Sequence, residues 1–292
     1  MKITFLDPPG ANFTDIARRK LAELFNQRIL LTADLELVKK NEEVLPTVIR
    51  HGGYGVVAME TIAEGRYDGP VGSFVHLLDH YQFSEACPTT VIAALKMRVE
   101  FALMARRGTR IEEVTEVLGH EKSFGACRRR IQERGWRFIQ SPSNGKAAEQ
   151  VAENPIFAKA VALGPRTAVE KYRRLCVFEE NFEDEQAVTT FYLLGPKSKK
   201  HIVGLREVNL SLLVCRLLNK PGMLAKVVGA FGSFGINLRH IRDFHVGGDE
   251  YAHVIHFDCR KDQASAHLLA IQKAVRSFAM ERYVLLGPFP VV

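Results

Sequence analysis

The chain has 292 residues, of which 47% are hydrophobic and 25% charged, a composition that predicts a globular protein with two domains and ample chain for a core. Its net charge of +7 is scattered, and the densest basic runs, residues 18–20 and 128–130, do not extend into the stripe typical of nucleic-acid binding. Five widely spaced cysteines without a Cys-x-x-Cys pair argue against a disulfide framework or a zinc knuckle, and no apolar run reaches the roughly 18 residues of a membrane helix, so we expect a cytoplasmic protein.

The first third of the chain predicts alternating strands and helices. Residues 2–6 predict a buried strand, and Thr14 caps a helix that runs to about residue 26. A second strand near residues 28–31, a helix that Asp34 opens and that continues to about residue 50, and a third strand over 55–59 follow. This alternation favours a parallel, doubly wound sheet.

The middle of the chain continues the alternation. Residues 90–106 are mainly apolar, and the segments 111–118 and 124–134 carry helix and strand patterns. Later predictions are a strand at 136–139, helices at 147–153 and 155–163, a strand at 188–194 and a polar linker at 196–200.

Two loops in this region leave a strand and enter a helix, namely Gly10-Ala11-Asn12 and Ser143-Asn144-Gly145. Each offers unpaired N–H groups and the positive end of a helix dipole to an anion. Two such loops on facing lobes would suit a small substrate with two carboxylates. The alternative is that both loops are ordinary turns.

The last third predicts a compact βαββαβ unit. A strand over residues 212–218 ends in Asn219-Lys220-Pro221-Gly222, and a helix with one apolar face follows until Gly235. Strands at 237–246 and 251–259 flank a glycine turn, and a helix at 263–278 and a strand at 282–286 complete a split, ferredoxin-like unit.

This unit resembles the ACT domain, a module that binds amino acids between two copies of itself. The resemblance rests on the Pro221-Gly222 turn and on the Gly-Ile-Asn sequence at residues 235–237. It implies a homodimer or homotetramer and an amino-acid effector, although Arg242-Asp243-Phe244-His245 replaces the Glu-Ser-Arg-Pro motif of the relatives that bind phenylalanine. An unrelated ferredoxin-like unit is the alternative. The implied effector-binding residues are Asn219, Pro221, Gly222, Met223, Leu224, Asn237 and Leu238.

Four motifs in sequence order resemble the prephenate dehydratase family. Residues 7–14 are similar to its Gly-Pro-x-Gly-Thr-(Phe/Tyr)-Ser opening, and residues 57–65 to its Pro-Ile-Glu-Asn-Ser-x-Glu-Gly segment. Residues 120–127 resemble Ser-His-Pro-Gln-Ala-Leu-x-Gln-Cys, and residues 188–191 contain the Thr and Phe of Thr-Arg-Phe.

The family resemblance implies the architecture of the whole chain. We expect a two-lobed, doubly wound α/β catalytic domain, similar to periplasmic binding proteins, over residues 1–200. Lobe one would cover about 1–75 and 175–200, lobe two about 76–174, and the ACT domain 207–292.

The same resemblance implies a lyase that decarboxylates and dehydrates prephenate to phenylpyruvate in phenylalanine biosynthesis, without a cofactor or a metal ion. Thr189 and Glu60 would be catalytic. Substrate binding would fall to Gly10, Ala11, Asn12, Thr14, Thr61, Lys122, Ser143, Asn144, Thr190 and Phe191.

The chain departs from the family at its active-site motifs. Thr190 replaces an Arg, and the loss of one charge-assisted contact costs roughly 1.5–3 kcal/mol. Lys122, where the family has Gln, is a candidate to restore the cation. Two alternatives stay open: a divergent decarboxylase that leaves the ring non-aromatic, and a catalytically silent amino-acid-binding regulator.

Overall fold

The computed structural model describes residues 2–63, 66–68, 74–75, 87–200, 203–278 and 282–292, with only the backbone for 60–63, 66–68 and 278. Contacts divide the chain into two compact units. The first contains the described residues of Met1–Val44, Val56–Asp68 and Lys96–Phe191, and the second those of Leu45–Gly55, Gly69–Leu95 and Tyr192–Val292.

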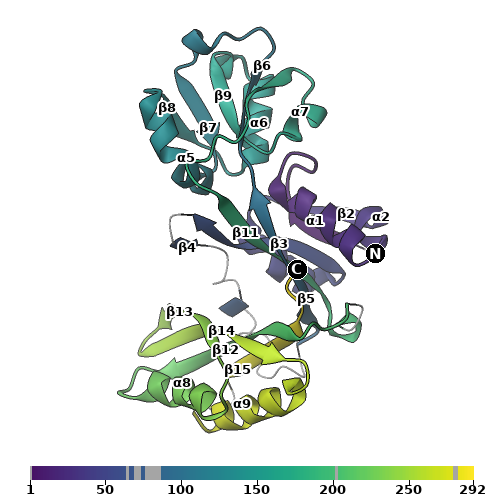
Figure 1. Ribbon diagram of the computed structural model, residues 1–292, viewed down its shortest axis with the longest axis vertical. Helices are drawn as coiled ribbons and strands as arrows, with labels where there is room; N and C mark the ends of the chain where they lie inside the picture. Colours follow the sequence, from purple (N-terminus) through teal and green to yellow (C-terminus); the bar gives the residue numbers. More distant parts are fainter. Residues whose placement is uncertain (1, 64–65, 69–73, 76–86, 201–202, 279–281) are drawn as a thin grey trace. The chain divides into compact units, whose positions relative to one another are not determined.

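The first unit begins with a sheet whose strand order is β2-β1-β3-β11-β5, with β4 paired to β3 (Figure 1). Strands β1 and β2 are parallel, and β3, β5 and β11 continue into the second unit. The strands are β1 (Lys2–Leu6), β2 (Asp34–Val38), β3 (Tyr54–Ala63), β4 (Arg66–Asp68), β5 (Thr89–Val99) and β11 (Ala187–Pro196). The helices α1 (Phe13–Leu24) and α2 (Ile29–Thr32) belong to the first unit, and α3 (Val44–His51) belongs, apart from Val44, to the second.

A second sheet in the first unit forms the other lobe, drawn in teal in Figure 1, with the strand order β10-β6-β9-β7-β8. Its strands are β6 (Ala102–Arg106), β7 (Glu116–Gly119), β8 (Arg137–Gln140), β9 (Ala160–Gly164) and β10 (Leu175–Glu179). Helices α5 (Glu121–Glu133), α6 (Asn144–Glu153) and α7 (Ala168–Lys171) belong to this lobe. Small apolar side chains, among them Ala147, Ala148 and Ala162, let α6 pack closely on the sheet. The predicted two-lobed α/β arrangement is confirmed.

The C-terminal part of the second unit has the predicted βαββαβ order. Its antiparallel sheet, β13-β14-β12-β15, packs through Leu213, Ile255 and Tyr283 against Phe231 and Ile271 of the two helices. The elements are β12 (Val208–Leu218), α8 (Met223–Ser233), β13 (Leu238–Gly247), β14 (Glu250–Arg260), α9 (Ala264–Phe278) and β15 (Tyr283–Phe289).

Three predicted elements are wrong. The predicted strand at 28–31 is α2, and the predicted helix from Asp34 to residue 50 is β2 followed by a 3-10 turn and α3. The predicted helix at 155–163 is the 3-10 turn Pro155–Phe157 followed by β9. All five residues of β9 are buried between neighbouring strands and helices, so their continuous apolar run carries no strand periodicity.

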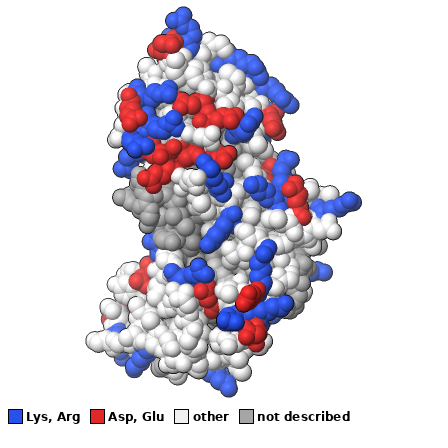
Figure 2. Space-filling view, viewed as in Figure 1, with Lys and Arg blue, Asp and Glu red and all other residues white. Residues whose placement is uncertain are grey.

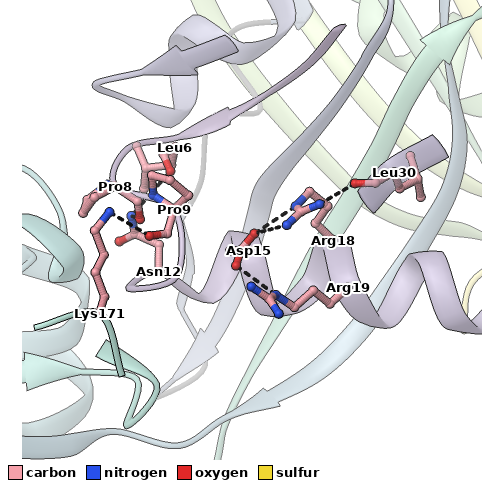
Figure 3. A network of polar contacts seen from close by, with 9 residues as sticks. All are labelled: Leu6, Pro8, Pro9, Asn12, Asp15, Arg18, Arg19, Leu30 and Lys171. Atoms are coloured by element: carbon pink, nitrogen blue, oxygen red, sulfur yellow. Dashed lines mark hydrogen bonds and ion pairs between the residues drawn. The ribbon is translucent and has the colours of Figure 1, made fainter. Parts of the chain in front are cut away.

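A buried ion pair fixes the orientation of α1 (Figure 3). The Asp15 carboxylate accepts hydrogen bonds from Nε and Nη2 of Arg18 at 2.8 and 2.6 Å, and Arg18 also donates to the carbonyl oxygen of Leu30. The guanidinium lies 5.2 Å from the centroid of the Phe5 ring. Because both charges are paired and buried, the network attaches α1 to β1 and α2 at a defined angle.

Charged side chains of both signs are interspersed on the face shown in Figure 2. This distribution agrees with the scattered Lys and Arg residues of the sequence. No described helix is long and apolar enough to cross a membrane.

Thiol reactivity should distinguish Cys176 from the other four cysteines. Cys176 is half-buried, whereas burial raises the pKa of the other thiols, that of Cys215 to about 12. Because the thiolate is the reactive species, we expect an aromatic disulfide reagent at pH 8 to modify Cys176 first, and all five cysteines after denaturation. The burial of the other thiols would be contradicted if mass mapping showed that one of them reacts as fast as Cys176; these thiols are Cys87, Cys127, Cys215 and Cys259.

Candidate active site

Three helices of the first unit begin at one hollow between its two lobes. Helix α1 begins after Asn12, α5 after His120 and α6 after Ser143. Their positive dipole ends favour bound anions, whereas several first-turn amides, among them those of Lys122, Gly145 and Lys146, already donate to protein acceptors. The described lining residues are Leu6, Asn12, Phe13, Thr14, Asn41, Ala58, Met59, Val99, Phe101, His120, Lys122, Ser123, Ser143, Asn144, Thr189 and Phe191.

Asn12 connects the loop before α1 to the start of α6. Its Nδ2 donates to the carbonyl oxygen of Pro8 at 3.0 Å (Figure 3), and its Oδ1 accepts from the Gly145 amide at 2.9 Å. A Cβ atom on Gly145 would lie 2.6 Å from Cδ of Pro8, so only glycine permits this approach.

Two further hydrogen bonds join the same segments. Ser143 Oγ donates to the carbonyl oxygen of Asp7 at 3.2 Å, and Lys171 Nζ donates to that of Pro9 at 2.9 Å (Figure 3). Together with Asn12 they hold the 7–12 loop against the second lobe.

Asn144 organises the first turn of α5. Its Oδ1 accepts from the backbone amide of His120 at 3.0 Å and from the hydroxyl of Ser123 at 2.7 Å. His120 in turn caps the helix, because its Nδ1 accepts from the amide of Lys122 at 3.2 Å. A neutral imidazole in this arrangement carries its proton on Nε2 and is a hydrogen-bond donor there.

Strand β11 contributes one hydroxyl and one ring to the hollow. Thr189 and Phe191 line it, whereas Thr190 does not, because successive side chains of a strand point to opposite faces. A T-shaped pair of Phe13 and Phe101, with ring centroids 5.2 Å apart, adds an apolar wall. The hollow therefore combines helix N-termini, hydroxyl groups and aromatic rings.

The family model described as prephenate dehydratase matches residues 3–199. The chain belongs to the prephenate dehydratase family. The predicted family and enzyme class, a lyase of the prephenate dehydratase type, are thereby confirmed.

Sequence relatives and solved structures are similar to this chain over most of its length. The prephenate dehydratase of Methanocaldococcus jannaschii is 25% identical over 245 residues, which cover 83% of each chain. The structure of prephenate dehydratase from Arthrobacter aurescens, described as a complex with L-Phe, is 19% identical, has a TM-score of 0.76 and matches 99% of this chain and 90% of its own. A structure described as the quorum-quenching acylase GqqA has a TM-score of 0.75 at 20% identity, and the match covers 100% of this chain and 98% of its own. The fold alone therefore does not determine the reaction.

The chain is shorter than some relatives. It spans 65% of the length of the bifunctional chorismate mutase/prephenate dehydratases of Stutzerimonas stutzeri and Pseudomonas aeruginosa that it matches.

Most of the site residues predicted from the sequence meet at the hollow. Those that line it are Asn12, Thr14, Lys122, Ser143, Asn144, Thr189 and Phe191. Gly10 and Thr190 do not line it, and Ala11 is fully buried in the core of the second lobe. Glu60 and Thr61 belong to β3 directly after the lining residue Met59, but their side chains lie outside the described residues.

Thr190, where the family has an Arg, is not part of the described lining of the hollow. Lys122 is the only Lys or Arg among the described lining residues. Its predicted role in restoring the cation stays a prediction.

Three polar lining residues were missed: Asn41, His120 and Ser123. His120 and Ser123 lie in the third family motif, so their position was available from the sequence. Asn41 begins the 3-10 turn Asn41–Glu43, and no local pattern marks it as part of a site. No group of three or more His, Cys, Asp or Glu side chains suited to a metal ion occurs within the described part of the chain.

A second hollow lies where β12 meets α8. The predicted effector residues Asn219, Met223 and Leu224 line it, together with Asp243 and His253, whose Oδ1 and Nδ1 atoms are 2.6 Å apart. The other predicted effector residues, Pro221, Gly222, Asn237 and Leu238, do not line it. The Asn237 side chain instead donates to Asp258 at 2.9 Å, and Leu238 packs on the module core.

Proposed function

We propose that the protein decarboxylates and dehydrates prephenate to phenylpyruvate. The observation that carries this proposal is the placement of the Thr189 side chain in a hollow at which three helices begin. Prephenate carries two carboxylates and a ring hydroxyl, and the reaction releases carbon dioxide and water as the ring becomes aromatic.

The carboxylates would bind at the helix N-termini. The first turn of α5 offers the Lys122 ammonium, and that of α6 offers the positive end of its dipole beside the Ser143 hydroxyl, while the Gly145 and Lys146 amides are already bonded to Asn12 Oδ1 and Ser143 Oγ. Phe13, Phe101 and Phe191 would contact the ring. The two anionic groups and the apolar ring thus have separate, matching surroundings.

Thr189 would assist departure of the ring hydroxyl. Hydroxide is a poor leaving group, so a hydrogen-bond donor directed at it lowers the barrier. The electron pair of the breaking C–CO₂⁻ bond enters the ring, the C–O bond breaks, and a proton taken up from solvent joins the departing hydroxide to form water. His120 lines the same hollow and is a second possible donor.

The direct test is incubation of the purified protein with prephenate, with proton NMR and ultraviolet spectra of the product. Phenylpyruvate supports the proposal. A decarboxylated but non-aromatic keto acid would instead identify the decarboxylase alternative, and unchanged prephenate would contradict both lyase reactions.

Loss of the Lys122 ammonium should weaken substrate binding. We expect Lys122→Gln, which restores the residue typical of the family, to raise KM for prephenate by about 10- to 100-fold, because one charge-assisted contact is worth roughly 1.5–3 kcal/mol. Lys146→Gln, which removes a half-exposed ammonium paired with Glu149 in α6, is the matched control. Steady-state kinetics with an unchanged KM in Lys122→Gln would refute the carboxylate contact.

The C-terminal module is part of the same proposal. We infer that residues 207–292 form an ACT domain that follows a catalytic domain over 1–200, that it pairs in a homodimer or homotetramer, and that it binds an amino acid. The βαββαβ order and the hollow beside Asn219 support this. Calorimetry with amino acids and light scattering test it, and a monomer without binding heat would contradict it. A cytoplasmic location belongs to this proposal as well.

A further inference from the structure

Helix α5, which supplies Lys122 to the hollow, is broken in its middle. Cys127 has φ −125° and ψ 15°, which are not helical angles. A break of this kind leaves carbonyl groups of the first segment and amides of the second without helical partners. Those groups must therefore find partners elsewhere.

Asp184 provides those partners. Its carboxylate accepts from the amides of Arg129 and Arg130 at 2.8 and 3.1 Å, and its own amide donates to the carbonyl oxygen of Ala126 at 2.8 Å. The carboxylate thus serves as an N-cap for the second segment, where a negative charge also interacts favourably with the helix dipole. One residue satisfies both ends of the break.

Phe182 and Glu183, directly before Asp184, make hydrogen bonds to Phe101. Phe101 lies where the chain passes from β5 in the first sheet to β6 in the second. The amide of Phe182 donates to the carbonyl oxygen of Phe101 at 2.8 Å, and Glu183 Oε2 accepts from the amide of Phe101 at 3.0 Å. Glu183 is buried, and its second oxygen lies 3.7 Å from Arg98. Phe101, which lines the hollow, is therefore fixed from the same short segment.

We propose that Asp184 is a positioning residue for the active site: by capping the broken α5 it sets the direction of the first turn that carries Lys122 and Ser123. This inference rests on the proposed function, since the first turn of α5 lines the hollow assigned to the substrate. Asp184 itself is not among the lining residues. Its effect on catalysis passes through the helix.

Removal of the Asp184 cap should lower the turnover number. A displacement of about 1 Å at a reacting group costs up to about 100-fold in rate, so we expect Asp184→Ala to lower kcat by about 10- to 100-fold. Asp184→Asn keeps one hydrogen-bond acceptor, and asparagine is about as good an N-cap residue as aspartate. This variant should therefore keep most of the activity that Asp184→Ala loses.

The experiment compares both variants with Asn154→Ala. Asn154 accepts the Ile156 amide at 3.1 Å at the opposite end of α6, so its loss removes a cap in the same lobe without approaching the hollow. For each variant we would record kcat, KM, the melting temperature and hydrogen exchange of the peptide covering residues 120–127.

For Asp184→Ala we expect faster exchange in residues 120–127 and a lower kcat. For Asn154→Ala we expect an unchanged kcat, even if its melting temperature falls by as much as that of Asp184→Ala. Unchanged exchange in residues 120–127 would overturn the inference. So would an equal loss of kcat in Asn154→Ala, which would indicate general destabilisation. If the wild-type protein does not convert prephenate, the proposed function fails, and the exchange data still decide the role of Asp184.

Discussion

Thr189→Val should reduce turnover of prephenate by about 10²- to 10⁴-fold, the usual range for the loss of one proton donor. Valine keeps the β-branched shape that suits a strand, and the side chain at this position is buried. The substitution therefore removes the hydroxyl with little change in packing. KM should change much less than kcat, because the donor acts on the leaving group that develops charge in the transition state.

The neighbouring Thr190 offers a matched control. It is equally buried in β11, but it does not line the hollow. Thr190→Val should therefore retain kcat, and Thr189→Ser should recover part of it. Product formation by NMR and stopped assays would measure all three variants. Equal losses in Thr189→Val and Thr190→Val would exclude a specific role for the Thr189 hydroxyl.

Gly145→Ala should produce the second large effect, a fall in kcat/KM of about 100-fold. The added Cβ would lie 2.6 Å from Cδ of Pro8 and 2.8 Å from Nδ2 of Asn12. The proline ring cannot rotate away, so the 7–12 loop must move and the hydrogen bond from the Gly145 amide to Asn12 lengthens. The cost in stability is expected to be about 1–3 kcal/mol, as for other overpacked sites.

Gly125→Ala is the control for this variant. A Cβ on Gly125, within α5, meets no atom within 4 Å outside the adjacent residues and the backbone of its own helix, so the exchange should leave activity unchanged and stabilise the helix by about 0.5–1 kcal/mol. Kinetic assays and thermal unfolding would be recorded together. Wild-type kcat/KM in Gly145→Ala would show that close approach of the 7–12 loop to α6 is dispensable for catalysis.

The residues of the candidate site that lie at the start of a helix were predictable from the sequence. Asn12 and Ser143 lie directly before α1 and α6, and Asn144 is the first residue of α6, so a local strand-to-helix pattern identifies all three. The hydrogen bonds among them were not predictable. Asn144 binds residues that precede it by 21 and 24 positions, and such contacts depend on how α5 and α6 pack rather than on nearby sequence.

The fold was predictable to a similar extent. The C-terminal module has clear amphipathic helices and a glycine turn, so its order was correct throughout. Strand β2 was not recognised, because it lies at the edge of its sheet and its Leu35 and Leu37 are 46% and 42% exposed. Its alternating pattern does not report which face is buried, and Asp34, its first residue, resembles a helix cap.

The stacking of Trp136 on Phe182 has a spectroscopic consequence. Trp136 is the only tryptophan of the chain, its ring centroid lies 6.3 Å from that of Phe182, and the guanidinium carbon of Arg134 lies 5.2 Å from its ring. Its fluorescence therefore originates from one place, next to the residues that join the two sheets of the first unit. Emission spectra recorded during a titration with prephenate would follow that junction directly, without a label and without turnover as the readout.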